Sequence, residues 1–176
     1  HNVLNSLSVA AAASLCGLTP AQIAEGIADF HGAGRRFEFL GTYAGVTVAD
    51  DYAHHPEELE ATITSVRKMF PTRHLTAVFQ PHLYTRTRDL YREFAAALSH
   101  ADDVVLVPIY PARELPIEGV GSEMIMDLVT VPCRICEREC LAQDLGAAST
   151  DVVVSFGAGN IDAYCEAIAA ELEKKA

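Results

Sequence analysis

Hydrophobic and polar positions follow two different patterns along the chain. The first thirty residues are rich in alanine, with apolar side chains at helical spacing. Gly17 is placed as the C-cap of a first helix, and Thr19 and Pro20 supply an N-cap and a first-turn proline for a second. The expected helices are 2–16 and 20–30. The glycine-containing segment HGAGRR (31–36) reads as a linker after them.

Beyond the linker, short apolar segments alternate with amphipathic ones. The expected strands are 36–41, 45–51, 75–80, 103–109, 131–135 and 151–156. The expected helices are 56–68, 84–98, 122–128 and a last one that follows Gly159. Continuous apolar strands between helices indicate an α/β fold with a mostly parallel sheet and helices on both faces. We therefore divide the chain into a helical segment, 1–31, and a domain, 32–176.

Composition narrows the class of protein. Of the 176 residues, 24 are acidic and 13 basic, for a formal net charge of −11. The chain has no long basic tract, which argues against a nucleic-acid partner, and no apolar run near the ~20 residues that span a bilayer. Five cysteines, an odd number, favour a reducing, cytoplasmic setting. The chain opens at His1, within a predicted helix, and we expect it to be a piece of a longer polypeptide.

Three of the cysteines, Cys133, Cys136 and Cys140, have a spacing that could hold a metal ion. A tetrahedral zinc site needs a fourth ligand, and no histidine or further cysteine lies close in sequence. An ordinary reduced segment is the favoured interpretation.

Unusual polar residues follow several predicted strands. They lie in DDYAHHP (50–56), QPHLYTRTR (80–88), YPARE (110–114) and GAGN (157–160). In open α/β sheets, ligands bind beyond the carboxyl ends of the strands. We therefore expect these segments to form one site at that edge.

The segment 50–56 offers carboxylates and imidazoles just before a helix. Asp50, Asp51, His54 and His55 could hold a metal, accept from a ribose hydroxyl or move a proton. A metal-dependent hydrolase is thus one alternative. The structural alternative is that one aspartate caps the turn and one histidine packs beneath it.

Two arginines, Arg86 and Arg88, lie at the start of a predicted helix, where the helix dipole disfavours cations. An anion between them and the helix N-terminus would explain both. The alternative is a surface pair with Asp89 or Glu93.

Weaker signals come from the linker and the last strand. Arg35 and Arg36 could reach a phosphate from the hinge side. Gly157 and Gly159 lack the third glycine of a dinucleotide fingerprint, so tight strand-to-helix packing or a minor ligand contact is expected there. The sequence contains neither a phosphate-binding P-loop nor a nucleophile elbow.

In this order, HNVLN, GAGRRFEF, DDYAHHPEE, FQPHLYTRTR, IYPARELPI and FGAGNI resemble the C-terminal part of the alanine-adding Mur ligases of peptidoglycan synthesis. The element QPH-x-YTRT points to these enzymes rather than to the related ligases that attach a preformed peptide in recycling.

The resemblance implies a Rossmann-like C-terminal domain that receives the amino acid and closes over ATP, with 1–31 as the end of a central ATP-binding domain. It implies that ATP, with Mg²⁺ held elsewhere in the protein, activates the carboxylate of UDP-N-acetylmuramate for attack by L-alanine. A chain without the P-loop is expected to be inactive alone. Positioning and charge stabilisation, which such chemistry needs, suit arginines and helix N-termini.

The resemblance also implies roles for particular residues. ATP contacts fall on Asn2, Asn5, Arg36 and Asp51, and L-alanine contacts on Tyr52, His54, His82 and Arg86. Of these, Arg36, Asp51, His54 and Arg86 are the expected catalytic residues. Many relatives carry arginine at the position of Leu83, so Arg86 and His82 are left with more of the anion binding. The resemblance implies no metal ligand in this chain.

Overall fold

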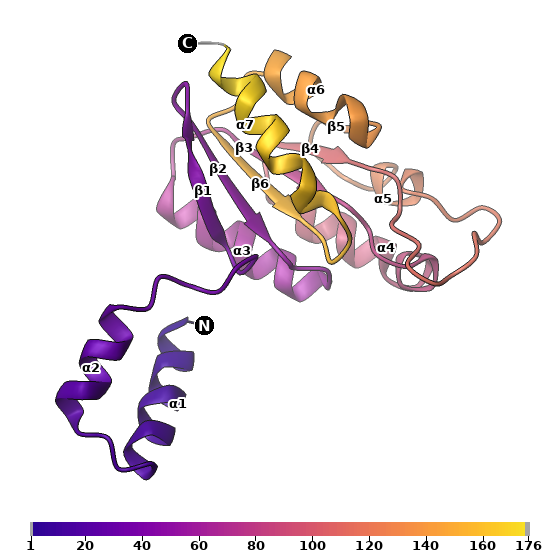
Figure 1. Cartoon of the computed structure of the whole chain (residues 1–176). Coiled ribbons are helices and arrows are strands. Elements are labelled where there is room, and N and C mark those ends of the chain that lie inside the picture. Colours follow the sequence, from indigo (N-terminus) through magenta and orange to yellow (C-terminus); the bar gives the residue numbers. More distant parts are fainter. Residues whose placement is uncertain (1, 175–176) are drawn as a thin grey trace. The chain divides into compact units, whose positions relative to one another are not determined.

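The computed structural model describes residues 2–174 and divides into two compact units, His1–Ala33 and Gly34–Ala176 (Figure 1). Each unit is described by itself.

The first unit is a pair of helices, α1 (Asn2–Leu15) and α2 (Pro20–Ala28). Gly17, at φ 85°, ends α1 in a turn in which the Leu18 N–H donates to the Ala13 carbonyl. The Thr19 side chain caps α2 in a capping box, and the helix ends two residues earlier than the spacing predicts because Asp29 is its C-cap.

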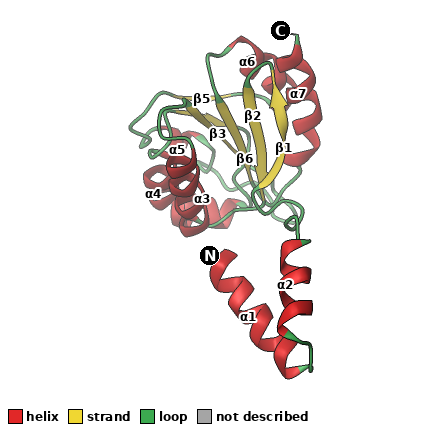
Figure 2. Ribbon diagram, turned by 90° about the vertical axis from the view of Figure 1, so that its left-hand side faces the viewer, coloured by secondary structure: helices red, strands yellow, loops and turns green. Residues whose placement is uncertain are grey.

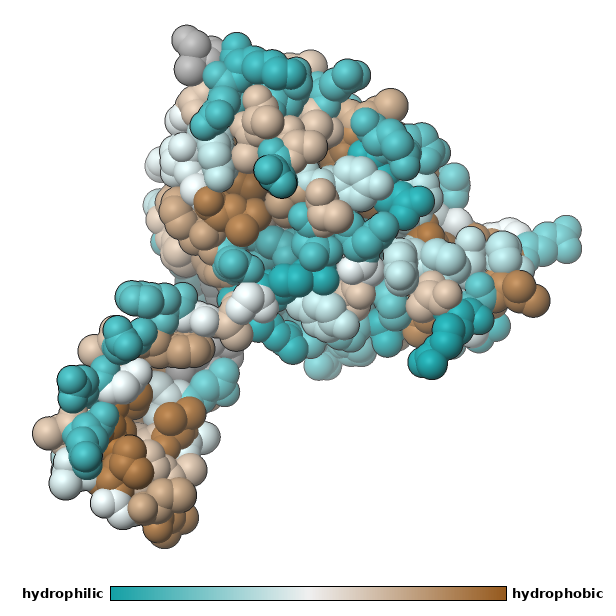
Figure 3. All heavy atoms as spheres, viewed as in Figure 1, coloured by the Kyte–Doolittle hydropathy of each residue, from teal (hydrophilic) through white to brown (hydrophobic). Residues whose placement is uncertain are grey.

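No side chain described in this first unit is buried. Large apolar side chains are exposed on both helices, and they form the brown surface of this unit in Figure 3. The most exposed are Val3, Leu4, Leu7, Leu15 and Phe30. Two helices without a buried residue have no core of their own to hold them together.

The second unit is built on one six-stranded sheet with the order β1-β2-β6-β3-β4-β5. The strands are β1 (Glu38–Tyr43), β2 (Val46–Asp51), β3 (Leu75–Phe79), β4 (Asp103–Leu106), β5 (Cys133–Ile135) and β6 (Val152–Phe156). The β1–β2 hairpin is antiparallel and every other pairing is parallel. The predicted α/β fold with a mostly parallel sheet is confirmed.

Helices cover both faces of this sheet (Figure 2). One face carries α3 (Pro56–Met69), α4 (Tyr84–Leu98) and α5 (Glu123–Met126), and the other carries α6 (Leu141–Ala147) and α7 (Cys165–Glu173). Short 3₁₀ turns, η1 (Arg138–Cys140) and η2 (Ile161–Tyr164), precede the last two helices. Among the residues of this structure that are described, no helix is long and apolar enough to cross a membrane.

Helix α6 was not predicted, and α5 is a single turn where seven residues were expected. Only Leu141 and Leu145 of α6 are buried, so a helix of seven residues leaves too short a periodic pattern to detect. In α5 only Ile125 is buried, and the chain turns away after one turn.

The position of β6 in the sheet determines where a ligand site is expected. It is the last strand in sequence, yet it lies between β2 and β3. After β2 and β3 the chain crosses to α3 and α4 on one face, whereas after β6 it crosses to α7 on the other. The carboxyl end of β6 is therefore the topological switch point, where α/β sheets open a crevice for ligands.

Candidate functional site

Of the two aspartates at the end of β2, Asp50 is a buried structural residue. Its Oδ2 accepts a hydrogen bond from Arg35 Nε at 3.0 Å, and its Oδ1 accepts one from Ser155 Oγ at 2.5 Å. Both carboxylate oxygens are held within the fold.

Asp51 is also buried and locally bonded. Its Oδ1 accepts from the Ala53 N–H at 2.9 Å and its Oδ2 from Thr62 Oγ1 at 2.8 Å. Burial raises the pKa of Asp51, against the opposing effect of these hydrogen bonds and of Arg36. The carboxylate thus fixes the turn into α3, as the structural alternative predicted for one aspartate.

His54 has one ring nitrogen that is hydrogen-bonded, and the other has no hydrogen bond within the described part of the chain. Its Nδ1 lies 2.9 Å from the Tyr52 carbonyl, which can only accept, so Nδ1 carries the hydrogen and Nε2 keeps the lone pair in the neutral ring. The His54 ring centroid is 6.4 Å from that of His82. His55, in contrast, is exposed at the start of α3.

His82 and Arg86 carry unmet hydrogen-bonding capacity. His82 Nδ1 and Arg86 Nη1 are buried, and neither has a partner among the described residues. The His82 ring stacks on Tyr110, with centroids 5.7 Å apart. Burial lowers the pKa of His82, and the neighbouring Arg86 and His54 lower it further, so the ring is neutral at pH 7. A polar or anionic ligand would satisfy both atoms.

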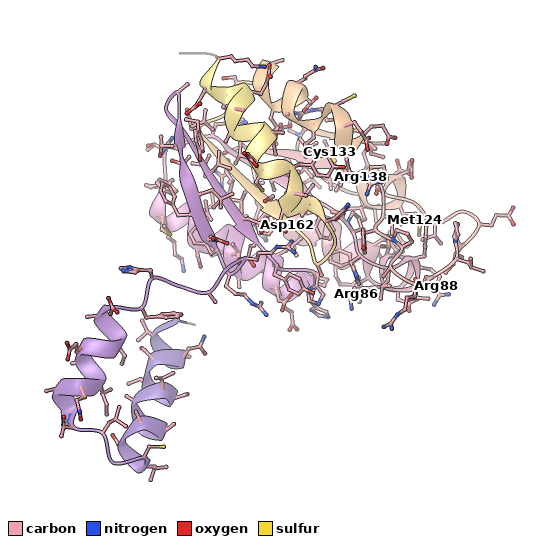
Figure 4. All side chains as sticks on the ribbon, in the orientation of Figure 1. Arg86, Arg88, Met124, Cys133, Arg138 and Asp162 are labelled. Atoms are coloured by element: carbon pink, nitrogen blue, oxygen red, sulfur yellow. The ribbon has the colours of Figure 1, made fainter. Side chains whose placement is uncertain are left out.

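Arg88 does not join this pair. Its Nε binds Asp89 Oδ1 at 2.7 Å on the exposed face of α4, so the surface alternative holds for Arg88. A carboxylate of the chain itself lies at the N-terminus of α4. Glu114 Oε2 accepts from the Thr85 N–H at 2.9 Å, and Glu114 Oε1 accepts from the Thr85 hydroxyl. Figure 4 labels Arg86 and Arg88 on α4.

The two linker arginines, Arg35 and Arg36, differ in how far their side chains are bonded and buried. Arg35 donates from Nη2 to the Gly157 carbonyl at 2.6 Å, and its Nη1 lies 3.4 Å from Asp162 Oδ1. With its bond to Asp50, this ties Arg35 to the switch point, and its side chain is only 24% exposed. The Arg36 side chain is 58% exposed and lies over the Tyr52 ring, and its Nη1 is 4.0 Å from Glu58 Oε1.

The glycines after β6 allow close packing, chiefly against Gln80 and Tyr110, which lie in loops rather than in a helix. A Cβ on Gly159 would lie 2.2 Å from Gln80 Oε1 and 2.7 Å from the Tyr110 ring. Gln80 is buried and pairs with Asn160, donating from Nε2 to Oδ1 and accepting from the backbone N–H, both at 3.0 Å.

Sequence reasoning missed three residues here: Gln80, Asn160 and Arg138. Arg138 Nη1 donates to Asn160 Oδ1 at 3.3 Å, while its buried Nε lacks a partner in the described part of the chain. Arg138 is labelled in Figure 4. The position of GAGN at a strand end was a signal for Asn160, but nothing in the sequence pattern distinguished Arg138.

No metal centre emerges. Within residues 2–174, no three His, Cys, Asp or Glu side chains are grouped closely enough to hold a metal ion. All five cysteines are free, and burial raises the pKa of Cys133 to about 11 and also raises that of Cys136. The metal-dependent hydrolase built on Asp50, Asp51, His54 and His55 is not supported.

Two of the expected ATP contacts belong to the first unit. Asn5 is an exposed residue of α1. The side chain of Asn2 lies outside the described part of the structure.

Known proteins resemble the chain in sequence. A ligase named UDP-N-acetylmuramate–L-alanine ligase from Phocaeicola vulgatus is 44% identical over 176 residues, covering 99% of this chain and 38% of the relative. One with the same name from Mycolicibacterium gilvum is 42% identical over 182 residues, with 100% and 38% covered. The chain thus spans well under half the length of these relatives.

Solved structures resemble it in fold. UDP-N-acetylmuramate–alanine ligase from Thermotoga maritima has a TM-score of 0.81 at 27% identity, over 100% of this chain and 38% of that one. A murein peptide ligase from Psychrobacter arcticus has a TM-score of 0.71 at 21% identity, over 98% and 37%, and shows a shared fold only.

The family described as Mur ligase, glutamate ligase domain, matches residues 35–159. This range begins at the arginine that ties the linker to the switch point and ends in the glycine segment after β6. It contains every proposed alanine contact of the site. The chain therefore belongs to the Mur ligase family.

Proposed function

We propose that the chain is the C-terminal part of a ligase that joins L-alanine to UDP-N-acetylmuramate in peptidoglycan synthesis in the cytoplasm. The names and 42–44% identity of the relatives support this, and so does their greater length. Residues 32–176 would be the domain that receives the amino acid.

One observation carries the proposed alanine site: the two buried, unpartnered atoms, His82 Nδ1 and Arg86 Nη1, at the carboxyl edge of the sheet. Leaving a buried donor unsatisfied costs about 1–3 kcal/mol, so such atoms favour a ligand that meets them. The carboxylate of L-alanine would bind the Arg86 guanidinium, beside the neutral ring of His82. Tyr52 and His54 would line the same end.

In the proposed reaction, ATP phosphorylates the muramoyl carboxylate. The alanine nitrogen then attacks the acyl carbon, the carbon–oxygen bond to phosphate breaks, and the nitrogen loses two protons as the amide forms. His54 Nε2, with its lone pair free, would accept one of these protons. Arg86 would hold the alanine in place for the attack.

The nucleotide would contact Arg36 and the turn that Asp51 fixes. The exposed guanidinium of Arg36 suits a phosphate. The described residues offer no set of ligands for Mg²⁺, so the metal would be held by another part of the full-length protein.

The first unit would be the end of the preceding ATP-binding domain, residues 1–31. It has no buried side chain among those described, and its apolar residues are exposed. Exposed apolar surface of this kind would be the contact face with the rest of that domain.

The test is phosphate release by the full-length protein with ATP, UDP-N-acetylmuramate and a panel of alanine, glycine, serine and a preformed cell-wall peptide. We expect release that depends on alanine. Release that depends only on the peptide would indicate the recycling ligase instead. The 176-residue chain alone should release no phosphate, and ligase turnover by it would contradict the proposal.

A further inference from the structure

We propose that Glu114 is a positioning residue for amino-acid binding: it holds the first turn of α4, and through it Arg86, in place. This inference rests on the proposed function. Glu114 lies in the loop after β4, 28 residues beyond Arg86 in sequence.

The first turn of α4 lacks a cap of its own. Leu83 occupies the N-cap position at φ 73°, a left-handed conformation that is unfavourable for leucine, and its side chain makes no capping hydrogen bond. The N–H groups of this turn therefore need an acceptor from elsewhere. Glu114 provides it, since it accepts from both the backbone N–H and the hydroxyl of Thr85.

The Glu114 loop is fastened along the segment that carries His82. The Tyr110 N–H donates to the Pro81 carbonyl at 2.8 Å, and the Leu83 N–H donates to the Tyr110 carbonyl at 3.0 Å. His82 and Tyr110 form an isolated parallel bridge and their rings stack. Glu114 lies four residues after Tyr110 in the same loop. Its carboxylate binds Thr85, and so it attaches the loop to α4 one residue before Arg86.

Charge gives Glu114 a second effect. The hydrogen bonds from Thr85 lower the pKa of Glu114, so it is ionised at neutral pH. Its negative charge raises the pKa of His82, against the lowering of that pKa by burial, Arg86 and His54. The same charge occupies the α4 N-terminus, so a substrate carboxylate would have to bind through Arg86 rather than through the helix end.

The experiment compares three variants of the full-length protein. Glu114→Ala removes the acceptor and the charge. Glu114→Gln keeps a carbonyl acceptor for the Thr85 N–H but removes the charge. Glu118→Gln is the matched control, because Glu118 is an exposed residue of the same loop.

We expect Glu114→Ala to raise the KM for alanine about tenfold, with the KM values for ATP and UDP-N-acetylmuramate changed less than about twofold. Glu114→Gln should fall between wild type and Glu114→Ala, and Glu118→Gln should match wild type. A lower Tm with an unchanged KM for alanine in both Glu114 variants would show that Glu114 only stabilises the loop, and would overturn the proposal.

A second measurement needs no ligase activity. In the 176-residue chain, NMR titration of the His82 ring should move to lower pH in Glu114→Gln, and amide exchange at Thr85 and Arg86 should accelerate in Glu114→Ala. Unchanged titration and exchange would also overturn the inference. If both change while the full-length wild type shows no alanine-dependent phosphate release, then the proposed function fails and the positioning of Arg86 by Glu114 stands.

Discussion

The two ends of the parallel strands are both rich in polar side chains, but they differ in how those side chains are satisfied. At the amino end a pocket of about 370 Å³ is lined by His74, Asp102, Asp103, Arg134 and Asp144, among others. The carboxyl end carries the proposed site.

The charges of the amino end are paired with one another. Arg134 donates to Asp103 and to Asp144, each at 2.6 Å, and Arg67 donates to Asp102 at 2.6 Å. All three buried polar side-chain atoms that lack a partner in the described chain belong to the carboxyl end: His82 Nδ1, Arg86 Nη1 and Arg138 Nε.

The difference teaches that the presence of a hollow is by itself a poor guide to function in this domain. A pocket whose charges neutralise one another offers a ligand little, because the ligand would have to break existing ion pairs. Unmet hydrogen bonds at a switch point offer a gain on binding. We therefore place the site at the carboxyl end.

The largest expected effect tests the carboxyl end. In the full-length protein, Arg86→Ala should lower kcat/KM for alanine about 100-fold, because a charged hydrogen bond to the substrate is lost. The measurement is alanine-dependent phosphate release. Arg88→Ala is the matched control. Arg88 lies two residues further along α4, is exposed and binds Asp89, so this variant should change kcat/KM less than about twofold. Equal losses in both variants would contradict the placement.

The next effect tests the amino end. Arg134→Ala leaves Asp103 and Asp144, both largely buried, without their partner. We expect the free energy of unfolding to fall by about 2 kcal/mol, measured by urea denaturation of the 176-residue chain. Activity per folded molecule of the full-length variant should match wild type. A selective loss of activity without loss of stability would give the amino-end pocket a functional role.

A smaller effect separates structure from chemistry at Asp51. Asn is isosteric and can accept from the Ala53 N–H while its amide faces Thr62. Because burial disfavours the charge of Asp51, Asp51→Asn should leave stability unchanged or slightly higher. If the carboxylate contributes to the reaction, as the resemblance implies, kcat should fall about tenfold. An unchanged kcat would show that Asp51 only stabilises the turn into α3.

The smallest effect is a pH dependence. The folded-state pKa of His82 lies below its ordinary value, so the unfolded chain binds the proton more readily. The resulting stabilisation is present above the ordinary histidine pKa and is lost as pH falls through the folded-state value. Urea denaturation at pH 7.5 and 5.5 should show a smaller loss in His82→Gln than in wild type. His100→Gln, an exposed control, should behave as wild type.

Most of the fold could be predicted from the sequence. The limits of α4 were predicted to the residue, and α3 to within one, because both helices have strong apolar stripes and clear end signals. The limits of α5 and α6 were not predicted. One buried isoleucine in α5 and two buried leucines in α6 are too few to give a detectable helical period.

The candidate site could be predicted only in part. The rule for strand ends brought His54, His82 and Arg86 to one edge. It could not distinguish Arg86 from Arg88, because both lie at the same strand end. In the structure, Arg86 has a buried Nη1, whereas Arg88 binds Asp89 on the surface. Nor could it separate Arg35, fixed on Asp50 and Gly157, from the neighbouring Arg36.

The sequence by itself therefore determined the α/β class, the order of its long elements and the segments that carry the chemistry, because these depend on local periodicity and short motifs. Only the tertiary structure decided which polar atoms remain free. That depends on partners distant in sequence, such as Glu114 for Thr85 and Ser155 for Asp50. Folding brings these residues together, and no local sequence pattern indicates that they will meet.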